Sequence, residues 1–262
     1  MTISERINAE RIVLFGWGRA ILLQLAHPLV AASVAEHSSF REGRFSAVVR
    51  LHHTVRAMTS LTFGTEEARG AALSGIMRIH RRVNGRLAAA VGPFPAGTPY
   101  SAEDPALVLW VHATLVESMP LVYELLVAPL SSDERDRYCR EAAPLAVALG
   151  ARADEVPGSW PALVAYLDRM HASGEIVVGE AARELADDVL APRFRALVAP
   201  VANANRVVTT ALLPECTRQQ YGLSWTQKDR RAYERWVRVL RFAHRGTPRP
   251  LRWWPEARRP SR

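Results

Sequence analysis

The stretch IVLFGWGRAILLQLAHPLVAASV (residues 12–34) is the most apolar part of the chain, and it decides the fold. It is about as long as a membrane span, but Arg19 would then place a charge within the bilayer, where charges are costly. Pro28 also interrupts it, and proline is well placed at the first position of a new helix, which needs no N–H there. We therefore expect two buried core helices, residues 12–26 and 28–40.

Helical periodicity continues along the rest of the chain, without a convincing two-residue alternation that would predict strands. Residues 92–98 hold two prolines and two glycines and are expected to form a loop. The predicted organisation is one all-α globular domain over residues 1–225, followed by a C-terminal helix and basic tail over residues 226–262. Further helices are predicted at residues 45–61, 65–91, 105–126, 132–149, 160–173, 179–190, 193–212 and 226–243.

Composition restricts the class of protein. The 262 residues are 48% hydrophobic and 23% charged, as in an average globular chain, which excludes disordered and low-complexity classes. The two cysteines, Cys139 and Cys216, have no motif spacing, which argues against a disulfide framework or a cysteine zinc site. The first residues do not form a basic and then apolar leader, so we expect a cytoplasmic protein without a transmembrane segment.

The chain is basic, with a net charge of +8, but Lys228 is its only lysine. Arginine is scattered along every segment and is in excess only in the tail, residues 238–262. A protein surface that binds the phosphates of a nucleic acid normally carries clusters of both lysine and arginine. We therefore expect no nucleic-acid partner. The tail is expected to be solvated or to contact an anionic surface, which leaves peripheral membrane contact open.

Six of the eight histidines lie in the first 112 residues, each on or beside an apolar helix. His80 is spaced by three and four residues from Ile76 and Val83, so its ring is expected on the buried face of its helix. His112 is placed in the same way next to Leu115. A lone histidine of this kind is usually a core residue hydrogen-bonded to a carbonyl. Two such stripes and a third histidine-bearing helix instead favour an apolar pocket that holds a haem or a buried metal.

That third helix, residues 45–61, adds polar groups. Arg50, His53 and Thr54 are spaced i, i+3 and i+4 and share one face, while His52 points about a quarter turn away. On this face the arginine could pair with a propionate, the threonine could donate a hydrogen bond, and His53 could face an open coordination position. The same spacing is also typical of a salt-bridged amphipathic helix.

Other motifs are weaker. GWGR (residues 16–19) resembles half of a nucleotide-binding fingerprint, but no strand precedes it and the third glycine is missing, so its glycines are expected to allow close helix contact. The chain has no Gly-x-Ser-x-Gly or His-Glu-x-x-His motif, which gives no support to serine hydrolase or zincin chemistry. A non-haem iron site from His52 or His53, a second histidine and Glu36 stays open by ligand type.

Several blocks, taken in order, carry a resemblance that no single block would carry. Together they cover about residues 10–225 and resemble the MpaB-type oxygenase family, which is related to the bacterial latex clearing protein. The blocks are GWGRA (16–20), QLAHPLVA (24–31), EHS (36–38), FGT (63–65), IH (79–80), VNG (83–85), YSAEDP (100–105) and WVHATL (110–115).

The resemblance implies an all-helical domain with a buried haem b pocket, which uses dioxygen on a hydrophobic, alkene- or isoprenoid-like substrate. In the latex clearing protein an arginine, and a threonine four residues later, lie by the haem, and a histidine on the next helix is the proximal ligand. Carried over to this chain, Arg50 and Thr54 match the first two residues, and His80 becomes the proximal iron ligand.

The distal position departs from the family pattern. The family has a lysine just before the threonine, where this chain has His53. The resting iron is then either bound by two histidines, or His53 is a base beside an open site. The family's catalytic glutamate falls near Glu36, where Glu36 and His37 compete for the role. Further candidate cofactor contacts are Arg19, His27 and His112, and hydrogen bonding behind the ligands is expected of the two histidines.

Two functions follow from these residues. The first is a haem b-dependent oxygenase in which His80 binds the iron, dioxygen binds near His53, and the surrounding helices supply an apolar pocket. The second is a haem-binding or haem-sensing protein with bis-histidine iron and no oxygenase turnover. The sequence leaves the substrate and the oligomeric state open.

Overall fold

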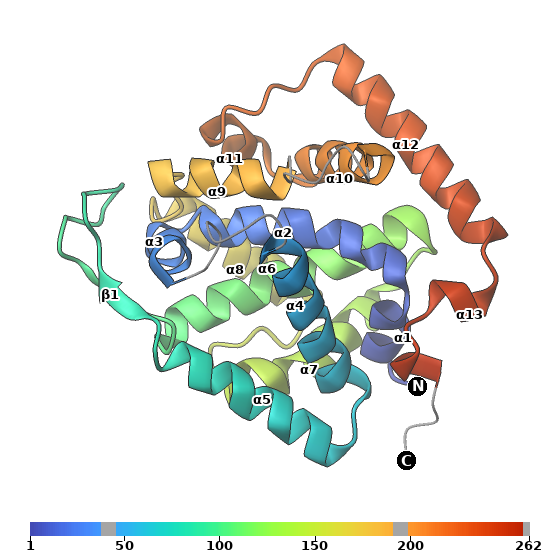
Figure 1. The fold of residues 1–262 in the computed structure, drawn as a ribbon, viewed down its shortest axis with the longest axis horizontal. Coiled ribbons are helices and arrows are strands. Elements are labelled where there is room, and N and C mark those ends of the chain that lie inside the picture. Colours follow the sequence, from blue (N-terminus) through green and yellow to red (C-terminus); the bar gives the residue numbers. More distant parts are fainter. Residues whose placement is uncertain (38–45, 191–198, 259–262) are drawn as a thin grey trace.

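A computed structural model describes residues 1–37, 46–190 and 199–258, and for residues 46–52 only the course of the backbone. The described part is mostly helical, and the one sheet within it is a two-stranded antiparallel hairpin (Figure 1). The predicted all-α single domain is confirmed. The elements are α1 (Ile3–Ala9), η1 (Arg11–Leu14), α2 (Phe15–Leu25), α3 (Pro28–His37), α4 (Ser46–Phe63), α5 (Glu66–His80), β1 (Asn84–Arg86), β2 (Pro99–Ser101), α6 (Pro105–Leu126), α7 (Ser132–Ala148), α8 (Trp160–Ala172), α9 (Glu180–Leu190), α10 (Ala199–Leu212), α11 (Glu215–Gln220), α12 (Gln227–Gly246), α13 (Arg249–Arg252) and η3 (Glu256–Arg258).

Helices α2 and α6 pack against each other at the centre of the fold, and α10 also packs on α2 (Figure 1). A Cβ atom on Gly16 would lie 2.9 Å from the carbonyl oxygen of Ser118 on α6. A Cβ atom on Gly18 would clash with the side chain of Thr209 on α10. The two glycines therefore allow α2 to touch both neighbours, which confirms the interpretation of the GWGR motif as a packing motif.

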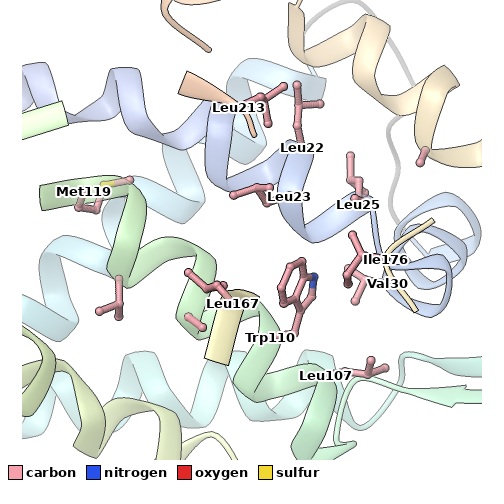
Figure 2. Packing of buried hydrophobic residues seen from close by; sticks show 14 of the residues in the cluster. Leu22, Leu23, Leu25, Val30, Leu107, Trp110, Met119, Leu167, Ile176 and Leu213 are labelled. Atoms are coloured by element: carbon pink, nitrogen blue, oxygen red, sulfur yellow. The ribbon is translucent and has the colours of Figure 1, made fainter. Parts of the chain in front are cut away.

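The main hydrophobic core surrounds Trp110 of α6, which is fully buried (Figure 2). Its indole Nε1 donates a hydrogen bond to the carbonyl oxygen of Gln24 at 3.4 Å. Burial of a leucine-sized or larger apolar side chain contributes about 1.5–3 kcal/mol, so this cluster is a large part of the folding free energy. The leucines of α2 that take part are Leu22, Leu23 and Leu25.

The chain bends sharply between α2 and α3, as the sequence predicts. The segments Arg11–Leu25 and Pro28–His37 are bent by 106°. His27 lies at the bend, and its Nδ1 accepts a hydrogen bond from the backbone N–H of Leu29 at 3.3 Å. The histidine thus satisfies one of the free N–H groups at the start of α3.

The prediction of one helix over residues 65–91 is wrong, because α5 ends at His80. The chain then forms strand β1, which pairs with β2 through Gly85 opposite Tyr100. A Cβ atom on Gly85 would lie 2.6 Å from Cζ of Tyr100, so only glycine lets the tyrosine ring lie across the hairpin. This long-range pairing competes with the local helical pattern and ends the helix early.

The two ends of the described chain lie side by side (Figure 1). Glu10 forms an isolated β-bridge with Trp253, and the backbone N–H of Trp254 donates to the carbonyl oxygen of Ala9 at 3.1 Å. The buried Glu10 carboxylate also accepts hydrogen bonds from the indole of Trp253 and from His244, both at 2.9 Å. The C-terminal segment is therefore fixed against α1.

Helix α6 is long and apolar enough to cross a membrane by length and composition, and the bent pair α2–α3 with η1 passes the same test as one broken span. In the described structure, 67% of the apolar window of α6 is buried inside the protein. Such burial is what the central helix of a packed domain shows, so length and composition are weak evidence for a span here.

Candidate functional site

A cavity of about 740 Å³ lies between α1, α3, α4, α5, α6 and α7. Its volume is in the range of about 300–1,000 Å³ that is typical of sites for small molecules and cofactors. Its walls are mainly aliphatic, with a smaller number of polar groups that could orient a ligand. The aliphatic wall includes Val30, Val34, Val55, Met58, Ile76, Ile79, Val83, Leu107, Val111, Leu115 and Val116.

His80, the last residue of α5, lines this cavity. Its Nδ1 atom is buried and has no hydrogen-bond partner among the described residues. Burial lowers the pKa of His80 below its usual value, because the charged imidazolium is desolvated there. An unsatisfied buried ring nitrogen is costly, and a neutral imidazole can bind a metal through whichever ring nitrogen carries no proton.

His112 lines the same cavity from α6. Burial lowers its pKa to about 4, so its ring is neutral at pH 7. Two helices that are adjacent in sequence order therefore bring two neutral imidazoles to one apolar cavity. This is the arrangement that the two histidine-bearing stripes predict.

Glu36 and His37, the two candidates for the catalytic role, both lie at the end of α3 but have different surroundings. His37 lines the cavity, and its Nε2 lies 3.0 Å from the carbonyl oxygen of Asn84, to which the ring N–H donates. Glu36 does not line the cavity, and instead its carboxylate accepts a hydrogen bond from the hydroxyl of Tyr100. Burial and the neighbouring carboxylate raise the pKa of Tyr100, so the phenol stays protonated and can donate. The catalytic roles proposed for His37 and Glu36 stay predictions.

Helix α4 contributes a face that includes Val55, Thr59 and Thr62 to the cavity. His53 and Thr54 are exposed and are not among the residues that line it. His53 lies two residues before Val55, about 200° around the helix, which explains why it turns away from the cavity wall. The roles of His53 as base or iron ligand and of Thr54 as haem contact stay predictions, and the side chains of Arg50 and His52 lie outside the described residues.

Arg19 and His27 lie away from the cavity and are used inside the fold. The Arg19 guanidinium donates to the Glu117 carboxylate at 2.7 Å and to the Leu212 carbonyl oxygen at 2.8 Å. His27 is buried, and its Nε2 lies 3.9 Å from a carboxylate oxygen of Glu175. Burial lowers the pKa of His27 to about 4. Cofactor contacts by these two residues stay predictions, and the contacts observed hold helices together.

Three residues at or beside the cavity, Arg69, Tyr100 and Trp254, were not expected from the sequence. Arg69 of α5 lines the cavity and offers a cation, and Trp254 lines it from the C-terminal segment. The guanidinium of Arg11 lies 5.1 Å from the Trp254 ring centre. Tyr100 begins the block YSAEDP, which was the available signal, whereas Trp254 lies in a basic tail that gave none.

Within the described ranges no three His, Cys, Asp or Glu side chains are grouped so that they could hold a metal ion. The side chain of His52 lies outside these ranges, so the non-haem iron alternative with Glu36 stays a prediction. Single imidazoles in an apolar cavity instead suit a macrocycle, which brings its own equatorial ligands to the iron.

Comparisons with known proteins indicate one family. A family model described as the catalytic domain of the ER-bound oxygenase mpaB/B' and rubber oxygenase matches residues 5–242. The uncharacterized proteins Mb2261 of Mycobacterium bovis and Rv2237 of Mycobacterium tuberculosis are each 31% identical over 242 residues, which cover 87% of this chain and 87% of each relative. No solved structure matches the chain.

Proposed function

The chain belongs to the mpaB and rubber oxygenase catalytic-domain family, and on that premise we propose that it is a haem b-dependent oxygenase of a hydrophobic, alkene-type substrate. Membership confirms the resemblance found in the sequence blocks and supports oxygenase activity, with a small-molecule substrate and oxygen. The observation that carries the haem proposal is the buried Nδ1 of His80, which has no partner in the part of the chain that the structure describes, on a residue that lines an apolar cavity of about 740 Å³.

His80 would bind the iron of the haem, because burial favours its neutral ring and one ring nitrogen has no partner among the described residues. Arg69, which lines the cavity, and Arg50, predicted from the family pattern, would pair with the propionates. When bound, haem b supplies the iron chemistry that activates dioxygen.

The chain's own residues would then shape the reaction. The aliphatic side chains of α3, α4, α5 and α6 exclude water and favour an apolar substrate. The His112 ring is neutral at pH 7, so one of its nitrogens can donate a hydrogen bond and the other can accept one. The Nε2–H of His37 donates to the Asn84 carbonyl oxygen, which orients the imidazole ring at the cavity wall.

A second candidate is a haem-binding or haem-sensing protein without oxygenase turnover. The observation that favours it is that His80 and His112 line the same cavity. If two imidazoles bind the iron, no position is open to dioxygen until one of them leaves. The original form of this alternative, with His53 as the second ligand, stays a prediction.

The first experiment is the absorption spectrum of the purified protein, with and without added haemin, together with a pyridine haemochrome assay. We expect a Soret band that His80→Ala abolishes or strongly weakens. His171→Ala is the matched control, because His171 does not line the cavity and contacts the buried Trp110 at a ring-centre distance of 5.9 Å. Protein that stays colourless with haemin, or an unchanged band in His80→Ala, would overturn the proposal.

The oxygenase and the haem-binding protein differ in whether a second histidine would bind the iron. Spectra of His112→Ala and His53→Ala, in the reduced state with and without dioxygen, separate them. An open site predicts a dioxygen-dependent change in the unaltered protein and in both variants. A bis-histidine site predicts a low-spin spectrum that becomes high-spin in only one variant, which identifies the ligand.

A further inference from the structure

Six residues form a straight stripe along α12. Lys228, Arg231, Arg235, Arg238, Phe242 and Arg245 follow one another at alternating intervals of three and four residues, which places them on one face of the helix. All six are exposed, and Phe242 keeps 82% of its surface accessible. We call this set the outer stripe.

The packing of the opposite face of α12 determines which way the outer stripe faces. Helix α12 packs on α10 and α6, and Val237 on its inner face is buried in a cluster with Tyr233 and Leu240. At its C-terminal end the buried His244 is held by Glu10. Because the inner face is anchored, the stripe is turned away from the body of the protein, along the edge where α12 runs in Figure 1.

The charge of α12 is strongly one-sided. Its 20 residues carry seven basic and two acidic side chains, a net charge of +5 in a chain of net charge +8. One of the two acids, Asp229, caps the helix start through Thr226. Across the described residues, no carboxylate forms an ion pair within 4.0 Å with any of the five cations of the stripe. The described carboxylates therefore do not neutralise the positive face.

Exposed apolar side chains lie among these cations. Besides Phe242, Val239 on the same helix is 46% exposed and Leu251 on α13 is 62% exposed. Isolated exposed apolar residues are common, but here they coincide with the most basic helix of the chain. A row of arginines with a protruding aromatic ring suits a surface that is negative outside and apolar just beneath.

We propose that the outer stripe binds a membrane surface that contains anionic lipid, with the arginines on the headgroups and the Phe242 ring inserted between them. Each Lys or Arg near an anionic bilayer adds to the binding, and an aromatic ring gains from the acyl boundary. A nucleic acid would use the cations but has no comparable place for the apolar tip. A second copy would bring the same positive face and repel it. The proposal goes beyond the oxygenase function and does not depend on it.

The test is co-sedimentation of the full-length protein with phosphatidylcholine vesicles, with and without phosphatidylglycerol. We expect binding to the anionic vesicles, which weakens as salt is raised because the charges are exposed. The double variant Arg235→Gln/Arg238→Gln is expected to lower the partition coefficient about twenty-five-fold, from about fivefold for each arginine. Phe242→Ser is expected to lower it about tenfold without changing the salt dependence.

The matched control is Arg78→Gln/Arg82→Gln, which removes the same net charge at the exposed end of α5. It is expected to bind as the unaltered protein does, and circular dichroism melts show that each variant is folded. Three results would overturn the proposal. The first is that the control variant loses as much vesicle binding as Arg235→Gln/Arg238→Gln. The other two are that the protein binds duplex DNA but not vesicles, or that it forms a dimer in solution that Phe242→Ser dissociates.

Discussion

His27 and His112 are two buried histidines whose pKa values are both lowered to about 4, yet their surroundings differ. His27 lies in the packed junction of α2 and α3, where its ring accepts a hydrogen bond from Leu29 and contacts Phe94 at a centre distance of 5.4 Å. His112 lies in the wall of a cavity that also contains His80, whose Nδ1 has no partner in the described part of the chain. Burial therefore does not distinguish His27 from His112, whereas the open space beside His112 does.

The largest expected effect separates the packed contacts of α2 with α6 and α10 from the cavity. Arg19→Leu is expected to lower the free energy of unfolding by about 3–5 kcal/mol, because the partly buried Glu117 carboxylate loses its partner. His80→Ala is expected to lower it by less than about 1 kcal/mol in haem-free protein, because it removes an unsatisfied buried nitrogen. Urea unfolding measures both, and similar losses in the two variants would remove the distinction.

A double variant sharpens this result. Glu117→Leu added to Arg19→Leu is expected to restore most of the lost stability, because an apolar pair of this size can replace a buried ion pair. If Glu117→Leu instead lowers the free energy of unfolding further, the destabilisation in Arg19→Leu comes from lost packing and not from the unpaired charge of Glu117.

The next effect is a loss of stability in acid that both regions share. The unfolded chain binds a proton at each histidine near the ordinary pKa of 6.5, and the folded chain does so only near 4. Each neutral histidine therefore makes its full contribution to the free energy of unfolding above about pH 6.5. This contribution is lost as the pH falls to about 4, and its upper limit is about 3 kcal/mol for each histidine. Urea unfolding of haem-free protein across this range measures it. His27→Gln and His112→Gln should each flatten the slope, and an unchanged slope in both would contradict the assignment.

A third comparison uses two helical glycines. Gly18→Ala is expected to cost about 1–3 kcal/mol, because the new methyl group meets Thr209. Gly75→Ala in α5 has nothing within 4 Å of the added atom and is expected to stabilise the protein by about 0.5–1 kcal/mol. Thermal unfolding should thus move in opposite directions for the two variants. The same sign in both would mean that α2 is not packed as tightly as described.

The smallest expected effect lies at the hairpin beside the cavity. Tyr100→Phe is expected to lower the free energy of unfolding by about 1 kcal/mol, because Glu36 loses a hydrogen-bond donor. Glu36→Gln should cost less, since its amide oxygen still accepts from the tyrosine. Thermal unfolding of the two variants measures the difference, and a larger loss for Glu36→Gln would show that the negative charge itself is required.

Local patterns were sufficient for the regular parts of the fold. The helix predicted over residues 105–126 is observed with the same ends, because the Asp104 side chain caps its start and Pro105 fits its first turn. The spacing of apolar residues also places His80 and His112 correctly on the cavity side of their helices. These features depend on neighbours within a few residues.

Features that depend on distant residues were not predictable. The early end of α5 depends on the pairing of Gly85 with Tyr100, fifteen residues away. The exposed position of His53 depends on which face of α4 packs inward, and the spacing of three polar residues does not decide that. Trp254 became part of the cavity only because Glu10 holds the C-terminal segment.

The contact between Glu10 and Trp253 also orders events during synthesis. It joins residues that are 243 positions apart, so the wall beside Trp254 cannot form while the ribosome is still making α12. That part of the cavity wall is therefore completed only after the last residues of the chain have left the ribosome.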